Sequence, residues 1–270
     1  MAHHPAPLGT LAFLSLICEC KMHGDDAGAL AASLNLLAKI LPTKQPSSLR
    51  NPRKALDSGG LPPQPRPMGN RLHHGDLPAD YQAGPVLAID TETLGLNPHR
   101  DRLCLVQLSR GDGDADLVQI APGDARAPNL ERILADPQVL KLFHFARFDI
   151  AVLCHRLGVM AQPVWCTKIA SKLTRTYTER HGLRDLVREL LGIEISKQQQ
   201  SSDWGAPNLT EAQLAYAASD VLHLHALKDK LEALLRRENR LDLAKACFDF
   251  LPTRARLDLA GWNGDVFAHE

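Results

Sequence analysis

Residues 85–96 read Pro-Val-Leu-Ala-Ile-Asp-Thr-Glu-Thr-Leu-Gly-Leu. The apolar run that begins at Val86 predicts a buried β-strand over residues 86–90. Asp90 and Glu92 stand at its end, two residues apart, so their side chains point to the same side of the strand. Two carboxylates on one face repel each other, and a divalent cation between them relieves the repulsion. The stretch therefore predicts a strand that ends in a candidate metal site.

Strand-like and helix-like patterns alternate after this stretch. Short apolar runs predict three more strands, and periodicity with end signals predicts five helices. The strands are expected at residues 103–108, 116–120 and 139–143, and the helices at 128–135, 148–157, 167–175, 183–191 and 210–237. Thr210 and Gln213 have the spacing of a capping box at the start of the last helix. Consecutive strands followed by a strand among helices favour an α/β domain with a mixed sheet covered by helices.

Two further acids and a tyrosine lie in predicted helices. Asp149 begins the helix that follows the run His144–Phe148, where the helix dipole alone could explain it. Asp220 lies four residues after Tyr216, so the phenol and the carboxylate share one helical face. Taken singly, Asp220 could be a solvent-facing helical residue and Tyr216 a core aromatic. Their functional interpretation depends on the combination with Asp90 and Glu92.

Three segments together carry a family resemblance. DTETLGL at 90–96, HFARFD at 144–149 and YAASD at 216–220 resemble the three motifs of the DEDD 3′-5′ exonucleases, in the tyrosine (DEDDy) branch. The histidine branch would have His at position 215, which is alanine here. The chain thus resembles ribonuclease D over residues 85–235. The resemblance implies a ribonuclease H-like exonuclease fold, α/β, with a mixed five-stranded sheet flanked by helices.

Further tracts resemble the nanoRNase C family, bacterial enzymes that degrade very short RNA. These tracts lie at 94–109, 166–183, 196–204 and 245–262. The resemblance implies a metal-dependent 3′-5′ exoribonuclease that hydrolyses dinucleotides and other very short RNA oligomers to nucleoside 5′-monophosphates. A general ribonuclease D-like exonuclease acting on RNA or DNA is the enzymatic alternative. An inactive nucleic-acid-binding assembly protein is a third, although such a scaffold has no need to keep repelling acids together.

The resemblance also implies roles for the acids. Two divalent cations, Mg²⁺ or Mn²⁺, lie about 4 Å apart in two-metal sites and suit oxygen ligands. Asp90 would bridge both ions, Glu92 and Asp220 would hold the ion on the side of the attacking water, and Asp149 the other. Tyr216 would orient or deprotonate that water, and orientation is favoured because an unperturbed phenol is a poor base at neutral pH.

Substrate contacts are expected from four residues. Leu96 resembles the leucine that wedges between the bases of a dinucleotide, with core packing beside a turn as the alternative. His144 or Phe145 could stack on a base, and core packing of Phe145 is an equal alternative. Lys197 lies in the polar run 196–202, beside basic residues that could attract phosphates or simply form a solvated helix face: Lys168, Lys172, Arg175, Arg180, Arg184 and Arg188.

The composition divides the chain near Met68. The chain has 270 residues and no net charge, 44% of its residues are hydrophobic, and this composition excludes a fully disordered chain or a multi-span membrane protein. Residues 1–67 hold seven Lys and Arg, four Asp and Glu, and nine of the 18 prolines. The Pro-rich tract 41–68 predicts a linker or disorder. We therefore expect residues 1–67 to be a disordered or non-native extension, with translation from Met68 as one hypothesis, and residues 68–270 to form the exonuclease domain with a C-terminal helical tail.

Three remaining expectations concern compartment, redox state and assembly. The apolar run 8–17 is too short to span a bilayer and lacks the flanks of a signal peptide, so a cytoplasmic protein is expected. The six cysteines show no paired spacing that would indicate a disulfide framework. The family resemblance implies a homo-oligomer, an octameric ring. The apolar tract 247–262 could serve its interface or cover its own domain.

Overall fold

The computed structural model describes residues 69–123, 126–196 and 198–269. The predicted extension over residues 1–67, the proposed start at Met68 and the predicted substrate residue Lys197 lie outside the described residues. Within the described part, no helix is both long enough and apolar enough to cross a membrane.

A mixed sheet forms the centre of the fold. Its six strands, in the part of the chain described, have the spatial order β1-β4-β3-β2-β5-β6. They are β1 (Asn70–His74), β2 (Val86–Thr93), β3 (Leu103–Ser109), β4 (Ala115–Gln119), β5 (Leu140–Phe143) and β6 (Val164–Cys166). β3 pairs antiparallel with both β2 and β4. The other pairs are parallel: β1 with β4, β5 with β2, and β6 with β5. The expected α/β exonuclease fold with a mixed sheet is confirmed.

The sheet has one strand more than the five expected. Both edge strands give weak sequence signals, because β1 has the sequence NRLHH with a single apolar residue and β6 has only three residues. β1 is held to β4 by polar side chains as well as by its ladder. Arg71 Nε donates to Asp116 Oδ1 at 2.8 Å, and His73 Nε2 lies 2.8 Å from the same oxygen. Contacts of this kind leave no hydrophobic pattern in the sequence.

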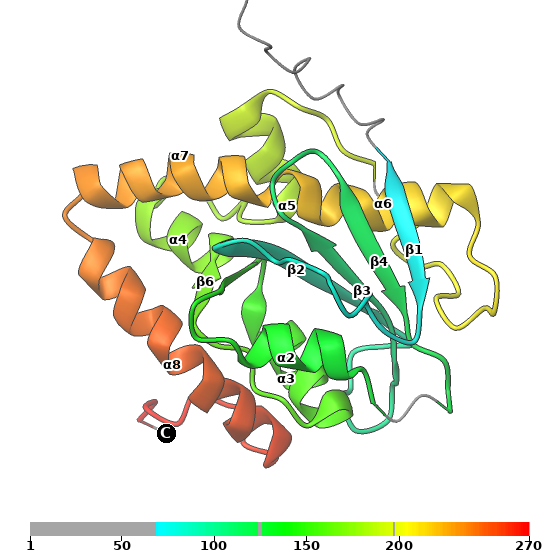
Figure 1. The fold of residues 1–270 in the computed structure, drawn as a ribbon. Helices are drawn as coiled ribbons and strands as arrows, with labels where there is room; N and C mark the ends of the chain where they lie inside the picture. Colours follow the sequence, from blue (N-terminus) through cyan, green and yellow to red (C-terminus); the bar gives the residue numbers. More distant parts are fainter. Residues whose placement is uncertain (1–68, 124–125, 197, 270) are drawn as a thin grey trace, which may run out of the picture. The chain divides into compact units, whose positions relative to one another are not determined.

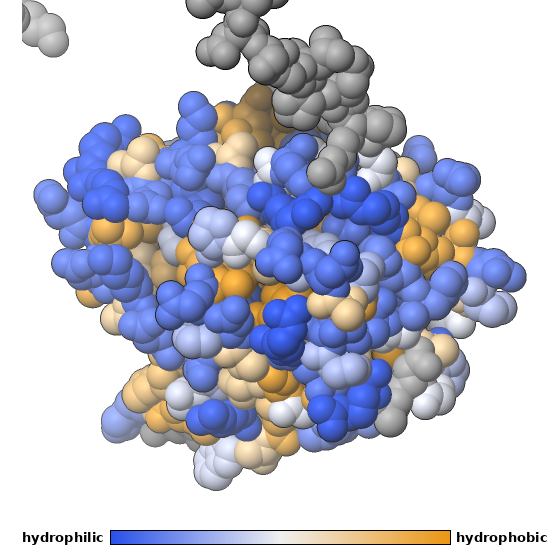
Figure 2. All heavy atoms as spheres, viewed as in Figure 1, coloured by the Kyte–Doolittle hydropathy of each residue, from blue (hydrophilic) through white to orange (hydrophobic). Residues whose placement is uncertain are grey.

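Helices cover both faces of the sheet. Figure 1 shows α6 and α7 across one face and α2 and α3 across the other. The helices are α2 (Pro128–Ala135), α3 (Ala146–Leu157), α4 (Thr167–Thr174), α5 (Leu183–Leu186), the π-helix η1 (Val187–Leu191), α6 (Glu211–Leu222), α7 (Leu224–Arg237) and α8 (Leu241–Leu259). β3 and β4 are buried along their whole length, as expected for strands covered on both faces. On the surface drawn in Figure 2, hydrophobic residues form separate patches among hydrophilic ones.

Two predicted helices are divided. The segment 183–191 begins as α5 and continues as the π-helix η1. The predicted helix over 210–237 is interrupted at His223, whose φ of −100° and ψ of −6° separate α6 from α7. The break lets α6 follow β2, β3 and β4 while α7 packs on α4 and β5. The predicted capping box between Thr210 and Gln213 is confirmed.

Candidate active site

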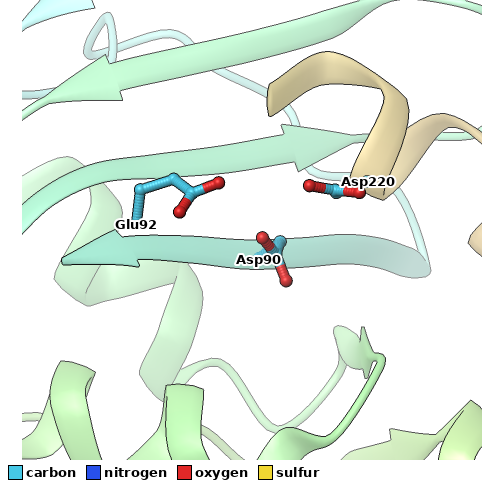
Figure 3. Close-up of side chains that lie close together, drawn as sticks. All are labelled: Asp90, Glu92 and Asp220. Atoms are coloured by element: carbon cyan, nitrogen blue, oxygen red, sulfur yellow. The ribbon is translucent and has the colours of Figure 1, made fainter. Parts of the chain in front are cut away.

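Three carboxylates meet where the end of β2 lies beside α6. Asp90 and Glu92 project from β2, and Asp220 projects toward them from the helix (Figure 3). One oxygen from each carboxylate can be chosen so that all three lie within 4.8 Å of one another. Strand alternation places the first two on one face, and α6 packs on β2, which brings the third residue to the same face.

The electrostatics of this group favour a bound cation. Burial, followed by the neighbouring acids, raises the pKa of Asp90 well above its ordinary value and that of Glu92 to about 9. Burial also raises the pKa of Asp220 to about 7. Ionised together without a cation, these carboxylates repel one another and lose hydration. An all-oxygen donor set of this charge fits Mg²⁺ or Mn²⁺.

The fourth predicted acid, Asp149, lies outside this close group. It projects from the first turn of α3 and is only 4% exposed. Thr91 Oγ1 donates a hydrogen bond of 2.7 Å to Asp149 Oδ1. Burial raises the pKa of Asp149 to about 7, and the Asp149 charge in turn raises the pKa of Asp90 and of Glu92. Asp149 thus interacts electrostatically with the clustered carboxylates, and one of its oxygens accepts a hydrogen bond from Thr91 on β2.

Tyr216 lies one turn before Asp220 on α6 and lines a cleft beside the three carboxylates. Its ring packs beside Trp204, with the ring centroids 6.0 Å apart. Burial and then the Asp220 charge raise the pKa of the phenol above its ordinary value. The hydroxyl therefore stays protonated at neutral pH and faces the acidic group as a donor.

A cleft of about 310 Å³ opens over the three carboxylates. We call it the carboxylate cleft; besides Asp90, Glu92 and Asp220, its lining includes His144, Phe145, Lys168, Arg184, Gln200 and Tyr216. The predicted substrate residues His144 and Phe145 are thus brought to the acids. Of the basic residues predicted to attract phosphates, Lys168 and Arg184 line this cleft.

His144 lies in contact with Thr167 at the cleft. Thr167 Oγ1 donates its hydrogen to the carbonyl of Phe143 at 3.2 Å, and it lies 2.8 Å from His144 Nδ1. The tautomer with the proton on Nδ1 satisfies both contacts at once, because Nδ1–H then donates to the hydroxyl oxygen while the hydroxyl donates to the carbonyl. Burial and then Lys168 lower the pKa of His144 to about 3, so the ring is neutral, and in that tautomer Nε2 is an acceptor. His144 therefore suits a hydroxyl donor better than a phosphate oxygen.

Phe145 and Leu96 are surface residues. Phe145 is 45% exposed, has a positive φ of 65° at the start of α3, and lies under Lys168 Nζ, which is 4.2 Å from the ring centroid. Leu96 is 84% exposed. The core-packing alternatives for both residues are therefore wrong, because the turn after β2 and the turn before α3 direct these side chains outward.

Leu96 lines two further cavities. The Trp204 cavity, of about 400 Å³, is bounded by Glu92, Leu94, Leu96, Phe148, Ser202 and Trp204 among others. The α8 cavity, of about 370 Å³, is bounded by Leu96, Asn97, Phe145, Arg147, Asp258 and Asn263 among others. The first of these shares Glu92 with the carboxylate cleft, and the second shares Phe145 with it.

The predicted basic surface is only partly present. The Arg175 side chain is 1% exposed, pairs with Glu189 and donates to Ser171 Oγ and to the carbonyl of Arg180. Arg188 pairs with Asp185 at 2.8 Å. The prediction for Arg175 is wrong, because helical spacing alone does not show that a side chain turns inward to a buried acceptor.

Several residues of the site gave no signal in the sequence. Thr91 and Thr167 are ordinary strand and helix residues until their partners are known. Gln107 lies opposite Asp90 on β3, is fully buried, and has no hydrogen-bond partner for either amide atom in the described part of the chain. Strand alternation could have pointed to Thr91, since it is the residue between the two acids and faces the opposite way.

The fold and the acidic site define a class. The mixed sheet is flanked by helices, and acids from β2 and α6 surround a cleft that could hold a metal ion. The family model described as 3′-5′ exonuclease matches residues 75–236. The chain belongs to this 3′-5′ exonuclease family, and the predicted family and enzyme class, a phosphodiester hydrolase, are confirmed.

Solved structures narrow the similarity to NrnC, which is nanoRNase C. Brucella melitensis NrnC bound to pGG is 60% identical, covers 75% of this chain and 100% of its own, and superposes with a TM-score of 0.73. Brucella melitensis NrnC with bound Mg²⁺ is also 60% identical, with a TM-score of 0.72 and the same coverage. The chain is therefore an NrnC-like exonuclease.

More distant relatives are ribonucleases D. The structure of Escherichia coli RNase D is 28% identical, with a TM-score of 0.56, and covers 64% of this chain and 45% of its own. Ribonuclease D of Gluconacetobacter diazotrophicus is 39% identical over 158 residues, which is 58% of this chain and 40% of the relative. The chain spans about 40% of the length of this curated relative.

Proposed function

We propose that the protein is a metal-dependent 3′-5′ exoribonuclease that hydrolyses dinucleotides and other very short RNA oligomers to nucleoside 5′-monophosphates. The observation that carries the proposal is the group formed by Asp90, Glu92 and Asp220, in a chain 60% identical to an NrnC structure with a bound dinucleotide. The similarity covers the whole of that NrnC chain, so it includes the surroundings of the acids as well as the acids themselves.

The proposed cofactors are two divalent cations, Mg²⁺ or Mn²⁺. Mg²⁺ is bound in an NrnC structure, and the close group of acids fits a hard cation. Asp90, Glu92 and Asp220 would hold one ion, and Asp90 with Asp149 the other. Such ions supply the positive charge that activates water and stabilises the leaving 3′-oxygen.

Tyr216 is proposed to orient the attacking water. An unperturbed phenol has a pKa near 10, so the hydroxyl keeps its proton at neutral pH and acts as a donor or an acceptor of fixed position. A hydrogen bond to Asp220, on the next turn of α6, would hold the hydroxyl in that position. The phenol and the carboxylate thus act as one unit of the site.

We propose that a short RNA strand is contacted by four residues: Leu96, Phe145, His144 and Lys197. Leu96 projects between two cavities, where it can separate two bases. Phe145 offers a half-exposed ring for stacking, a contact that does not depend on base identity. Neutral His144 would accept a hydrogen bond from a sugar hydroxyl.

A general ribonuclease D-like exonuclease is the competing function. The relatives named Ribonuclease D support it, although this chain matches less than half of their length. An inactive binding protein is disfavoured because repelling acids with raised pKa values cost stability that a scaffold has no reason to lose.

The direct test is hydrolysis of 5′-labelled pGG by the purified full chain. We expect nucleoside 5′-monophosphate as the product with Mg²⁺ or Mn²⁺, and no hydrolysis in EDTA. Asp220→Asn is the matched variant, expected to be inactive but folded. Hydrolysis that persists in EDTA would contradict the metal-dependent mechanism.

A homo-oligomer, an octameric ring, is proposed for the assembly. Exposed apolar residues on and after α8 could contribute to an interface: Leu243, Trp262 and Phe267. Light scattering of the purified chain tests the assembly, and a monomer at micromolar concentration would exclude it.

We also propose that the protein is cytoplasmic and that its translation starts at Met68. Mass spectrometry of the native protein tests the start, because peptides from residues 1–60 in a cell extract would exclude translation from Met68 alone. Fractionation of the same cells tests the location.

A further inference from the structure

Gln107, in the middle of β3, is fully buried. Neither its amide nitrogen nor its amide oxygen has a hydrogen-bond partner in the part of the chain that the structure describes. Most buried side-chain amides in folded proteins are hydrogen-bonded, because an unbonded one destabilises the fold. A buried glutamine of this kind calls for a partner close to β3.

The register of the sheet places Gln107 beside a proposed metal ligand. Gln107 is paired directly with Asp90 on β2, and residues paired in this way point to the same face of an antiparallel ladder. α6 covers this face, because it packs on β2 and β3 and carries Asp220 toward Asp90 (Figure 3). The Cβ atoms of directly paired residues lie about 4.5–5.5 Å apart, so a glutamine side chain can reach the carboxylate of its neighbour.

The other neighbours of Gln107 on this face of the sheet are poorer partners. Leu117, paired with it on β4, is apolar, and so is Leu105, two residues earlier on β3. The hydroxyl of Ser109, two residues later, already donates to a backbone carbonyl at 2.8 Å and accepts from a backbone N–H at 3.3 Å. The Asp90 carboxylate accepts no hydrogen bond from another side chain among the described residues. It is therefore the neighbour with a free acceptor.

We propose that Gln107 is a positioning residue for metal binding: its Nε2 donates to the Asp90 carboxylate and fixes the direction in which the oxygens face the metal. This inference rests on the proposed function, in which Asp90 is a ligand of both ions. A carboxylate that binds a metal keeps spare lone pairs, and a hydrogen bond from a second residue commonly orients it. A neutral amide orients the carboxylate without forming an ion pair that would compete with the metal.

The first test compares Mn²⁺ binding by the wild-type chain and by Gln107→Met, whose side chain has a similar length and no hydrogen-bond donor. Mn²⁺ is titrated into the metal-free full chain without substrate, and the free ion is measured by electron paramagnetic resonance. We expect the dissociation constant of the tightest site to rise at least tenfold, the lower end of the usual effect of losing such a partner. Equal Mn²⁺ affinity in the two chains would overturn the proposal.

Two further variants separate the hydrogen bond from a general disturbance of β3. Gln107→Asn keeps an amide that can still span the pair, so its dissociation constant should stay within roughly threefold of wild type. Ser109→Ala removes a buried, bonded hydroxyl from the same face of β3, opposite Ala88. It should lower the melting midpoint and leave the Mn²⁺ affinity unchanged. An equal loss of affinity in all three variants would overturn the role of the amide.

A crystal structure of the wild-type chain with Mn²⁺ tests the contact without any substitution, and it decides the question if Gln107→Met does not fold. We expect Gln107 Nε2 at about 2.7–3.2 Å from an Asp90 oxygen, the range of an N–H···O hydrogen bond. An amide turned away from Asp90, beyond hydrogen-bond distance, would overturn the proposal.

Hydrolysis of pGG separates this inference from the proposed function. If the wild-type chain binds Mn²⁺ and does not hydrolyse pGG, the proposed function fails, and the Mn²⁺ affinities still decide the role of Gln107. If it hydrolyses pGG, Gln107→Met should need at least tenfold more Mn²⁺ for half-maximal activity, with an unchanged KM for pGG at saturating Mn²⁺. A raised KM with an unchanged Mn²⁺ requirement would overturn the positioning role. A wild-type chain that binds no Mn²⁺ would overturn both.

Discussion

Tyr216 and Asp220 lie on successive turns of α6, and the proposed role of Tyr216 depends on its hydroxyl group. Tyr216→Phe removes that hydroxyl and keeps the ring against Trp204. We expect kcat to fall about 100-fold or more, the usual effect of losing a group that positions or transfers a proton. Steady-state kinetics on pGG measures the loss, and the melting midpoint should stay within a few degrees of wild type. A variant with full kcat would remove Tyr216 from the mechanism.

Leu96 offers a second test at the level of a single residue. The side chain is almost fully exposed, so Leu96→Ala removes no core contact and should leave stability unchanged. Contact of one apolar side chain with two bases is worth roughly 1.5–3 kcal/mol, which corresponds to a loss of about tenfold or more in kcat/KM for pGG. Ile193→Ala, also an exposed apolar residue but outside the cleft and the two cavities that Leu96 lines, is a suitable control. Equal kcat/KM in both variants would mean that Leu96 does not contact substrate.

The sequence could place some of these residues but not their partners. Asp90 and Glu92 were predictable as a pair because strand alternation fixes their common direction. Asp220 and Tyr216 were predictable as neighbours because they are four residues apart on a helix. The bond from Thr91 to Asp149 was not predictable, because it depends on how α3 packs on β2. The inward turn of Arg175 depends in the same way on Glu189.

Among the elements, β1 depends on polar contacts that can be tested by pH. Burial alone would raise the pKa of Asp116, but the hydrogen bonds from Arg71 and His73 outweigh it and hold the pKa below its ordinary value of 3.8. A group with a lowered pKa in the folded state stabilises the protein above its ordinary pKa, and the contribution is lost as pH falls through the folded value. The stabilisation by Asp116 should therefore be complete above about pH 4.

Asp116→Asn should reduce the free energy of unfolding by about 2 kcal/mol near pH 7, a modest value because Arg71 is partly exposed. The difference from wild type should shrink as the pH is lowered below 4. Urea unfolding at pH 7, 5 and 3 measures it. A difference that stays constant over this range would show that the charge of Asp116 does not hold β1.

The elements themselves were largely predictable, with informative exceptions. The four strands with apolar runs and the helix Pro128–Ala135 are present where the sequence predicts them. The edge strands β1 and β6 were missed because one is mostly polar and the other has three residues. The division of α6 from α7 was missed because the helical pattern continues through His223. The break depends on tertiary packing, since α6 packs on β2, β3 and β4 whereas α7 packs on α4 and β5.

For the whole molecule, the buried acids make stability depend on pH and on metal. Glu92 has an ordinary pKa of 4.5 that is raised to about 9, and Asp149 and Asp220 have ordinary values of 3.8 raised to about 7. Raised values mean that the folded protein holds protons that the unfolded chain releases. This contribution to stability is complete below the ordinary values and is lost as the pH rises through about 7 and 9.

The metal-free protein should therefore lose thermal stability between pH 6 and pH 9, and Mg²⁺ should raise the melting midpoint most at the upper end of that range. Asp220→Asn removes one of the repelling charges, so it should lose less stability with pH and gain less from Mg²⁺. Scanning fluorimetry in EDTA and in Mg²⁺ measures both effects. An equal gain from Mg²⁺ in the variant and the wild type would place the ion elsewhere.

Competition between a dinucleotide and a long strand tests whether this exonuclease acts on very short RNA. Labelled pGG and a labelled twenty-residue RNA are mixed at equal concentration with limiting enzyme and Mg²⁺, and the initial rates of both are followed. We expect pGG to be consumed at least tenfold faster, while the long strand stays nearly intact. Faster degradation of the twenty-residue strand would contradict it and support a general ribonuclease D-like activity.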